Sequence, residues 1–152
     1  MIVFPTPPVD TLVDGDLRLV LRETTTGDPA RGWVPDMRFN MRLQGVGDKV
    51  GGIQLRLGLT DELLYHAGQI GYGVDEQFRG QRLAARSVVL LLPVARAAGM
   101  EELWITCDPE NIASRRSLEI AGGELVEIRD IAEWSPMRVD GRTRSCRFRF
   151  AP

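Results

Sequence analysis

Cysteine, lysine and long apolar runs are scarce in this sequence. Of its 152 residues only two are cysteine, Cys107 and Cys146, and Lys49 is the single lysine. Two cysteines form neither a disulfide framework nor a set of metal ligands, and each lies in an apolar, strand-like run. We therefore interpret both as small buried side chains and expect no bound metal.

Signals for export and for membrane insertion are missing as well. The start of the chain, Met-Ile-Val-Phe-Pro-Thr-Pro-Pro, has no basic region and no full apolar segment, so it does not read as a signal peptide. The aliphatic run Leu90-Leu91-Leu92 is too short to cross a bilayer. We expect a cytoplasmic protein with no membrane partner.

The composition is typical of one packed domain. Apolar residues make up 43% and charged residues 26% of the chain, which disfavours disorder. We expect a single domain over residues 1–152, in which the Pro-rich start, residues 1–14, is loose. The net charge of −2 gives no general attraction to nucleic acid or to anionic membranes.

Basic residues gather near the C-terminal end of the chain. They are Arg138, Arg142, Arg144, Arg147 and Arg149. Such charge could attract an acidic acceptor or RNA, but no aromatic residues alternate with it as in RNA-binding motifs. We therefore interpret it as a solvated strand face and expect no nucleic-acid partner.

Periodicity and turn residues predict a layered α/β domain. The pattern predicts a half-buried strand over Leu17–Arg22, followed by a loop. The remaining predicted elements are a hairpin of Met37–Leu43 and Gly51–Leu57, a helical turn at Thr60–Leu64, strands Gln69–Val74, Leu103–Cys107 and Arg144–Phe150, and helices Leu83–Ala98 and Ser114–Ala121.

The segment from Val74 to Ala84 is the most informative part of the chain. A small-residue loop, Arg79-Gly80-Gln81-Arg82-Leu83-Ala84, joins a predicted strand to a predicted helix. Backbone N–H groups in such a loop point in one direction, and the helix N-terminus adds a partial positive charge. The segment therefore predicts a site for phosphate or pyrophosphate.

A second segment strengthens this prediction. The strand Leu103–Cys107 is followed by Asn111, by the short helix Ser114–Ala121 and by Gly122, which is a natural residue for closing a helix. Asn111 and Ser114 either contact a ligand beside the strand or only cap the short helix. Asp108 either reaches the same cleft or caps the turn before Asn111.

These two segments, in this order, resemble the cofactor half of GNAT-type acyl-CoA N-acyltransferases. With Gly32-Trp33-Val34-Pro35 and Val50–Arg56 the resemblance covers about residues 32–128 and points to a bacterial family of predicted acetyltransferases. It implies a mixed, mostly antiparallel central sheet of about six or seven strands, splayed at the cofactor strand and flanked by helices. It also implies acetyl-CoA as cosubstrate, bound by a core of about residues 67–123.

The resemblance and the loop together give the expected cofactor-binding residues. They are Tyr72, Gly73, Val74, Arg79, Gly80, Gln81, Arg82, Leu83, Ala84, Asn111 and Ser114. Relatives often carry Gly where this chain has Arg82, and His where it has Gln69. They also usually place two helices between the first two strands, for which the segment 23–36 is too short.

Few residues are available for the chemistry. Relatives use a Tyr as general acid at the position of Leu118, which leaves Tyr72 and Tyr65 as the phenols of this chain. His66 is the only histidine and precedes the key strand, so it is a candidate base, as are Glu62 and Asp61 on the same segment. We name Tyr72, His66 and Glu62 as candidate catalytic residues.

Three functions stay open at this point. The first is transfer of an acetyl group from acetyl-CoA to a primary amine of a small molecule or peptide, without a covalent enzyme intermediate. The second is a non-catalytic acyl-CoA-binding or sensing module. The third is an interaction protein on a degenerate GNAT fold, in which Arg82 would lie across the phosphate loop. Similar folds often form homodimers, so a homodimer is also expected.

Overall fold

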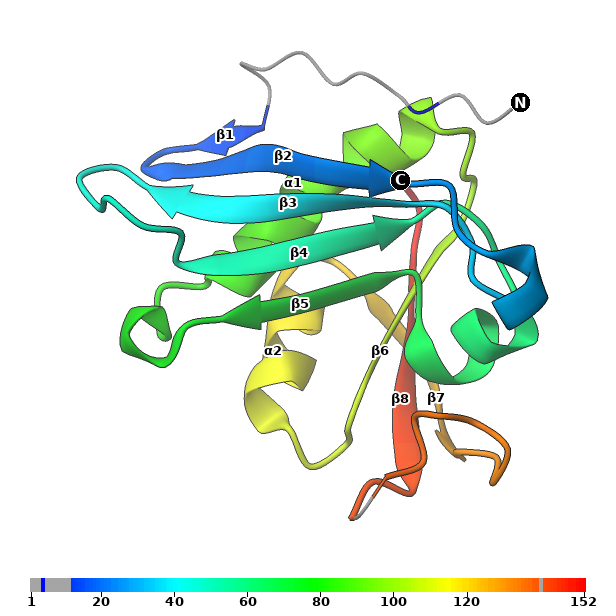
Figure 1. Cartoon of the computed structure of the whole chain (residues 1–152). Helices are drawn as coiled ribbons and strands as arrows, with labels where there is room; N and C mark the ends of the chain where they lie inside the picture. Colours follow the sequence, from blue (N-terminus) through cyan, green and yellow to red (C-terminus); the bar gives the residue numbers. More distant parts are fainter. Residues whose placement is uncertain (1–3, 5–11, 140) are drawn as a thin grey trace.

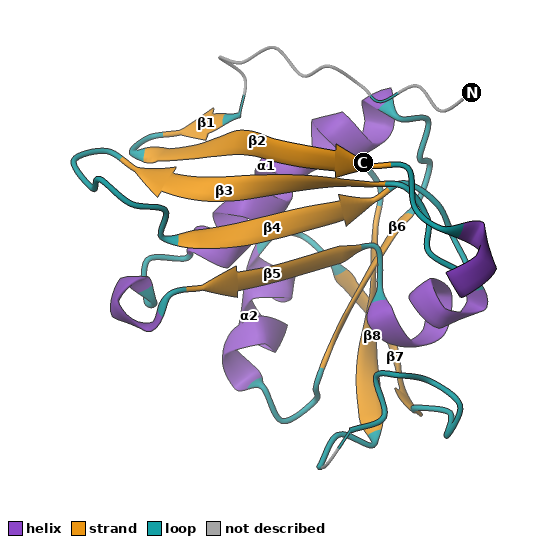
Figure 2. Cartoon of the chain, in the orientation of Figure 1, coloured by secondary structure: helices purple, strands orange, loops and turns teal. Residues whose placement is uncertain are grey.

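The computed structural model of the chain describes residues 4, 12–139 and 141–152 (Figure 1). Most of the segment 1–14 that was expected to be loose therefore lies outside the described residues. The described residues form two antiparallel sheets, with helices packed behind the first (Figures 1 and 2). The predicted α/β class is thereby confirmed.

The first sheet has five strands in sequence order. They are β1 (Val13–Asp14), β2 (Leu17–Thr25), β3 (Asp36–Leu43), β4 (Gly51–Arg56) and β5 (Ile70–Val74). The second sheet has three strands in the order β6 (Leu103–Cys107), β8 (Arg144–Phe150) and β7 (Glu124–Asp130). The predicted strand Leu103–Cys107 and the predicted strand Arg144–Phe150 have the observed bounds.

Two helices and three short turns connect these strands. They are α1 (Leu83–Ala97), α2 (Ile112–Ile120), 3-10 turns at Pro29–Arg31 and Glu76–Phe78, and a π-helical turn at Leu63–Ala67. The predicted turn at Thr60–Leu64 thus extends further and has a wider hydrogen-bonding pattern. None of the helices in the described ranges combines the length and apolar composition that crossing a bilayer requires.

The core lies between the first sheet and α1. Along β3 the buried side chains Met37, Phe39 and Met41 alternate with the half-buried Arg38 and Asn40, as expected for a strand with one face in the core. The inward face packs on buried positions of α1 such as Val88 and Leu91. Burial of this face fixes the register of the strands, because a slip by one residue would expose it.

The opposite face of the first sheet is bare. Figure 1 shows α1 and α2 behind the sheet, and no helix of the described residues lies in front of it. Residues 26–35, between β2 and β3, contain a single 3-10 turn, Pro29–Arg31, where relatives carry two helices. The shortened helical region that the sequence predicted is therefore present, and polar side chains of β2–β4 face solvent in its place.

The two sheets part between β5 and β6. The Gln69 N–H donates to the Trp104 carbonyl at 2.6 Å, and the Trp104 N–H donates to the Gln69 side-chain oxygen at 2.9 Å. The Gln69 side chain also donates to the Gly58 carbonyl at 2.8 Å. Since β5 and β6 belong to different sheets beyond this point, buried Gln69 holds the apex of the opening. The splay predicted for one sheet is a full separation into two.

Candidate active site

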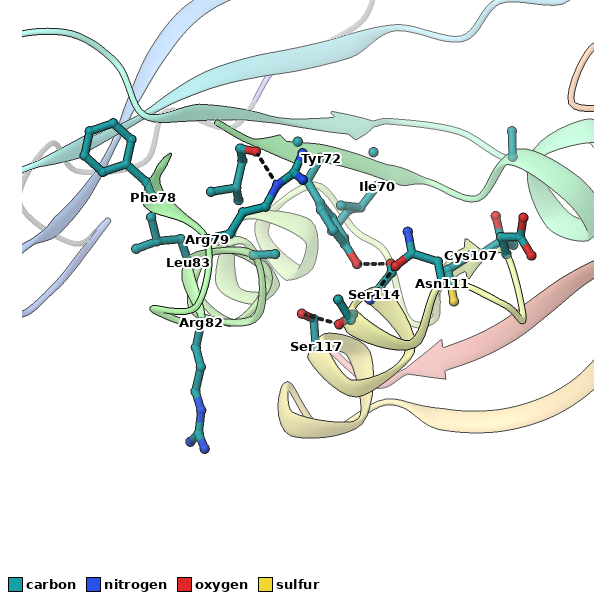
Figure 3. A pocket seen from close by; sticks show the side chains of 18 of the residues that line it. Ile70, Tyr72, Phe78, Arg79, Arg82, Leu83, Cys107, Asn111, Ser114 and Ser117 are labelled. Atoms are coloured by element: carbon teal, nitrogen blue, oxygen red, sulfur yellow. Dashed lines mark hydrogen bonds between the residues drawn. The ribbon is translucent and has the colours of Figure 1, made fainter. Parts of the chain in front are cut away.

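A cleft of about 530 Å³ occupies the opening between β5 and β6 (Figure 3). Its walls are β5, the loop that enters α1, the end of β6 and the start of α2. Ten of the eleven predicted cofactor-binding residues line it, and Gln81 is the exception. The two segments that the sequence singled out therefore meet in one place.

The loop before α1 forms one end of the cleft. Gly80 has a φ of +91° and Arg82 a φ of +59°, both in the left-handed region. Arg82 is the only non-glycine residue with positive φ in the described part of the chain. Arg82 therefore does not have the right-handed helical conformation that a side-chain-bearing residue adopts without strain.

The Arg82 side chain points away from the cleft centre. Figure 3 shows its guanidinium extending into open space, away from Tyr72 and Ser114. The conformation that would mark a degenerate, blocked phosphate loop is therefore not observed. Arg79 lies closer to the strand, since its Nε donates to the Val74 carbonyl at 3.1 Å.

The N-terminus of α1 opens onto the cleft without a cap. No side chain in the described part of the chain caps it, and its first turn contains no acidic residue. The first backbone bond of the helix runs from the Arg86 N–H to the Arg82 carbonyl at 2.9 Å, so the N–H groups of residues 83–85 have no partner within the helix. Leu83 and Ala84 line the cleft, which places these donors at its wall.

The edge of β5 that faces the cleft has unpaired backbone groups. The Arg56 N–H donates to the Gln69 carbonyl at 2.7 Å and the Asp75 N–H to the Val50 carbonyl at 2.9 Å. Alternate residues of a strand direct their backbone groups to opposite sides, so odd-numbered residues face β4. The backbone of Tyr72 and the N–H of Val74 therefore face the opening.

Tyr72 and Ser114 meet across the cleft. Their hydroxyl oxygens lie 2.6 Å apart, and either can donate (Figure 3). Burial raises the pKa of Tyr72, and the bond to Ser114 opposes this shift. The phenol therefore stays protonated at neutral pH and keeps a proton to donate.

Asn111 caps α2, as one of the two alternatives predicted. Its Oδ1 accepts from the Ser114 N–H at 3.1 Å. Its amide nitrogen has no partner among the described residues and lies at the cleft wall (Figure 3). Asp108 also lines the cleft, while its Oδ1 accepts from the Glu110 N–H at 3.0 Å, so it closes the turn as well.

The cysteines are free and buried. Cys107 lines the cleft and is 5% exposed, and burial raises the pKa of its thiol to about 12. A thiol of this pKa has almost no nucleophilic thiolate at neutral pH. Leu118, at the position where relatives carry a general acid, is fully buried in the core.

The structure does not bring His66 and Glu62 to the cleft. His66 is 3% exposed and packs edge-on against Trp134, with ring centroids 5.3 Å apart. Burial lowers its pKa, and nearby Glu62 opposes the shift. Glu62 accepts a hydrogen bond from the Ser135 hydroxyl at 2.8 Å. Neither residue is among those that line the cleft.

Several cleft residues were missed from the sequence. They are Arg56, Thr106, Met137 and Arg142. Arg56 had a usable signal, because alternation along Gly51–Leu57 directs it to the outer face of its strand, and Arg142 was noted only as part of the basic C-terminal group. Among the described residues no three His, Cys, Asp or Glu side chains gather in a way that could hold a metal.

A family model matches most of the chain. The model described as an acetyltransferase (GNAT) domain matches residues 18–124. This range includes β2 from its second residue, β3–β6, both helices and all the predicted site residues. No curated protein matches the chain by sequence.

Solved structures share the fold at low identity. The microcin C7 self-immunity acetyltransferase MccE, solved with acetyl-CoA and AMP, aligns with a TM-score of 0.60 and 14% identity, over 77% of this chain and 61% of MccE. RimL, a ribosomal L7/L12 alpha-N-protein acetyltransferase, aligns with a TM-score of 0.59 and 20% identity, over 80% of this chain and 72% of RimL. RimJ of Mycobacterium smegmatis, solved with CoA-disulfide, aligns with a TM-score of 0.60 and 21% identity, over 76% of this chain and 53% of RimJ. The chain thus spans less than two thirds of MccE and of RimJ.

Proposed function

The chain belongs to the acetyltransferase (GNAT) domain family, and from this premise we propose that it transfers the acetyl group of acetyl-CoA directly to a primary amine. One observation carries the proposal. The uncapped N-terminus of α1 and the unpaired edge of β5 face the same cleft, which is of a size suited to a small-molecule ligand. A phosphate-bearing, amide-bearing ligand fits such a pair of surfaces.

The loop before α1 would hold the pyrophosphate. N–H groups of residues 83–85 and the partial positive charge of the helix end both favour an anion there. The absence of an acidic residue from the first turn of α1 leaves this charge uncompensated. Gly80 has no neighbouring atom within 4 Å of where a Cβ would stand, so phosphate oxygens can approach its backbone.

The free edge of β5 would hold the pantetheine arm. The Tyr72 backbone supplies one donor and one acceptor, and Val74 supplies a further donor, in the pattern of a strand that has lost its neighbour. The amide nitrogen of Asn111 adds a donor from the opposite wall. This arrangement resembles pairing of an extended peptide with a sheet edge.

Strand β5 would assist the reaction at two atoms of the thioester, its carbonyl oxygen and its sulfur. An N–H of β5 would polarise the thioester carbonyl, in the manner of an oxyanion hole. The phenol of Tyr72, held at 2.6 Å from the Ser114 hydroxyl, would give a proton to the departing thiolate. The high pKa of the Cys107 thiol disfavours a covalent intermediate on this residue.

A second candidate function is a non-catalytic acyl-CoA-binding module. The cleft lining in the described residues contains no His and no Glu, and Asp108 is its only carboxylate. An enzyme would then pass the amine proton to Asp108 or to water. A binding module would need no such acceptor.

Calorimetric titration with acetyl-CoA and with free CoA tests what the two candidates share. Arg79→Glu should weaken binding at least tenfold, because it places a negative charge at the phosphate end of the cleft. Arg96→Glu makes the same change in charge on the last turn of α1, outside the cleft lining, and should leave binding unchanged. Binding that is lost in neither variant would contradict this location of the phosphates.

Turnover separates the two candidates. Acetylation of an amine panel, read by mass spectrometry, is expected for the wild-type protein. Tyr72→Phe should lower kcat roughly 10²-fold while CoA affinity changes little, because only the hydroxyl is removed. Binding of acetyl-CoA without transfer to any amine would favour the sensing module. The expected homodimer and cytoplasmic location stay predictions.

A further inference from the structure

The face of the first sheet that points away from α1, here called the front face, has a hollow lined by cationic side chains. The hollow, of about 370 Å³, lies over β2–β5. Arg22, Arg38 and Lys49 line it together with Asn40 and Gln54. Its lining in the described residues contains no carboxylate.

The carboxylates nearest to this hollow are already paired. Asp36 lies 3.3 Å from Arg38, and Glu23 lies 3.1 Å from Arg38 and 3.3 Å from Arg22. Asp36 also accepts hydrogen bonds from Thr25 and Gln54. Lys49 has no carboxylate within ion-pair distance among the described residues. These pairs offset part of the charge of Arg22 and Arg38, whereas Lys49 keeps its full charge. Three cations against two carboxylates leave this region with an excess of one positive charge, which a ligand with negative charges would complement.

The hollow and the cleft share one wall. Gly71, Tyr72 and Gly73 line both spaces, so only the backbone of β5 separates them at the two glycines. Gly71 and Gly73 carry no side chain toward the front face. A peptide that lies on the front face can therefore reach the cleft by passing the edge of β5 at these two glycines.

Arg56 stands where the two spaces meet. A Cβ added at Gly71 would lie 3.5 Å from the Arg56 Nη2, and Arg56 lines the cleft. Its Nη1 donates to the Gly68 carbonyl at 2.8 Å, and no carboxylate of the described residues lies within ion-pair distance. Burial lowers the pKa of Arg56, while Asp36 opposes this shift. The guanidinium stays charged and offers a planar fork suited to a carboxylate.

We propose that the front face of β2–β5 docks the acceptor, and that the acceptor is an acidic polypeptide segment whose free amine passes β5 to reach the cleft beside Arg56. This inference rests on the proposed acetyl transfer. The distance from β2 to β5 is three strand spacings, about 14 Å. An extended chain of about four residues covers this width, and about seven residues cover the roughly 23 Å along β4 from Lys49 to Arg56. A peptide with several carboxylates can reach Arg22, Lys49 and Arg56 together, whereas a free amino acid would reach Arg56 alone.

Fluorescence anisotropy on the CoA-saturated protein tests the docking surface. The probes are labelled eight-residue peptides with a free N-terminus, in which four side chains are all Glu, all Gln or all Lys. The Glu peptide should bind at least tenfold more tightly than the Gln peptide, with an affinity that falls from 50 to 300 mM salt. Binding is read without turnover, so the result does not depend on finding the natural acceptor.

Charge-reversed variants locate the surface. Arg22→Glu combined with Lys49→Glu should remove the preference for the Glu peptide, while Arg96→Glu, behind the sheet, should keep it. Both replaced side chains are exposed, and the single ion pair of Arg22 contributes little to stability. Arg56→Gln should raise KM for the Glu peptide and leave KM for acetyl-CoA unchanged.

Each alternative result is decisive. Equal affinity for Glu and Gln peptides, or equal loss in the double variant and in Arg96→Glu, would overturn the inference. So would a single-stranded RNA of the same charge that binds more tightly than the Glu peptide, and so would acetylation of the Gln peptide at the same kcat/KM. Failure to bind acetyl-CoA would instead refute the proposed function, since that measurement involves no peptide.

Discussion

Replacing Arg82 with glycine should stabilise the protein without weakening its affinity for CoA. Arg82 has φ 59° and ψ 28°, a left-handed conformation that costs a side-chain-bearing residue about 1–2 kcal/mol. Glycine avoids this strain but makes the unfolded chain more flexible, which costs about 0.5–1 kcal/mol. The free energy of unfolding should therefore rise by about 0.5–1 kcal/mol, which for a domain of this size is about 2 °C in Tm.

Scanning calorimetry measures the stability and titration calorimetry the affinity for CoA. Arg96→Gly is the matched control, because the same substitution inside α1 should lower stability by about 1 kcal/mol. Arg82→Asn, which tolerates the left-handed region, should have a smaller stabilising effect. A lower Tm for Arg82→Gly would refute the strain argument. A tenfold loss of CoA affinity would show that the Arg82 guanidinium turns back and contacts phosphate.

Three further changes test the frame around the cleft. Gln69→Leu should lower the free energy of unfolding by about 2–4 kcal/mol in urea titrations, because it leaves the buried N–H of Trp104 without its acceptor. His66→Asn should reduce the loss of unfolding free energy that accompanies a fall in pH below 6.5. Burial lowers the pKa of His66 in the folded protein, so the unfolded chain takes up the proton first as the pH falls from 6.5 towards that lowered pKa, and unfolding is favoured. Gly51→Ala should cost about 1–3 kcal/mol, since its Cβ would lie 2.5 Å from the Gly73 carbonyl oxygen, whereas Gly52→Ala, with 3.5 Å to its nearest atom, should be nearly neutral.

Three results would contradict these expectations. An unchanged stability in Gln69→Leu would mean that the apex of the opening is held by other contacts. Identical pH profiles of the wild-type protein and His66→Asn would mean that His66 titrates normally. Equal effects at Gly51 and Gly52 would contradict the close approach of β4 and β5.

The elements that the sequence predicted well are those with a strong local pattern. The alternation over Arg144–Phe150 and the apolar run Leu103–Cys107 gave the bounds of β8 and β6, because burial on one or both faces dictates the residue types. The edge strand β7 was missed, since all seven of its residues are exposed and its pattern is correspondingly weak. Local signals also located the loop that enters α1, because glycine and the residue types at a helix start are recognisable in a sequence.

The features that could not be predicted depend on contacts distant in sequence. In the sequence Gln69 stood out only because relatives often carry His at this position. Its hydrogen bonds to Gly58 and Trp104 form only when three separate segments have come together. His66 precedes the key strand in sequence, yet the π-helical turn carries its ring under Trp134 and away from the cleft. The left-handed conformation of Arg82 is likewise a property of the folded loop before α1, which residue type alone does not disclose.

Only strand β5 separates the cleft from the hollow on the front face, and this arrangement has a consequence for the kinetics. If the cosubstrate enters from the helix side and the acceptor from the sheet side, neither blocks the path of the other. Binding order is then random, and both substrates must be present together before reaction. Double-reciprocal plots should intersect, and CoA should compete with acetyl-CoA while inhibiting noncompetitively towards the amine. A protein that reacts through a modified enzyme would give parallel plots instead.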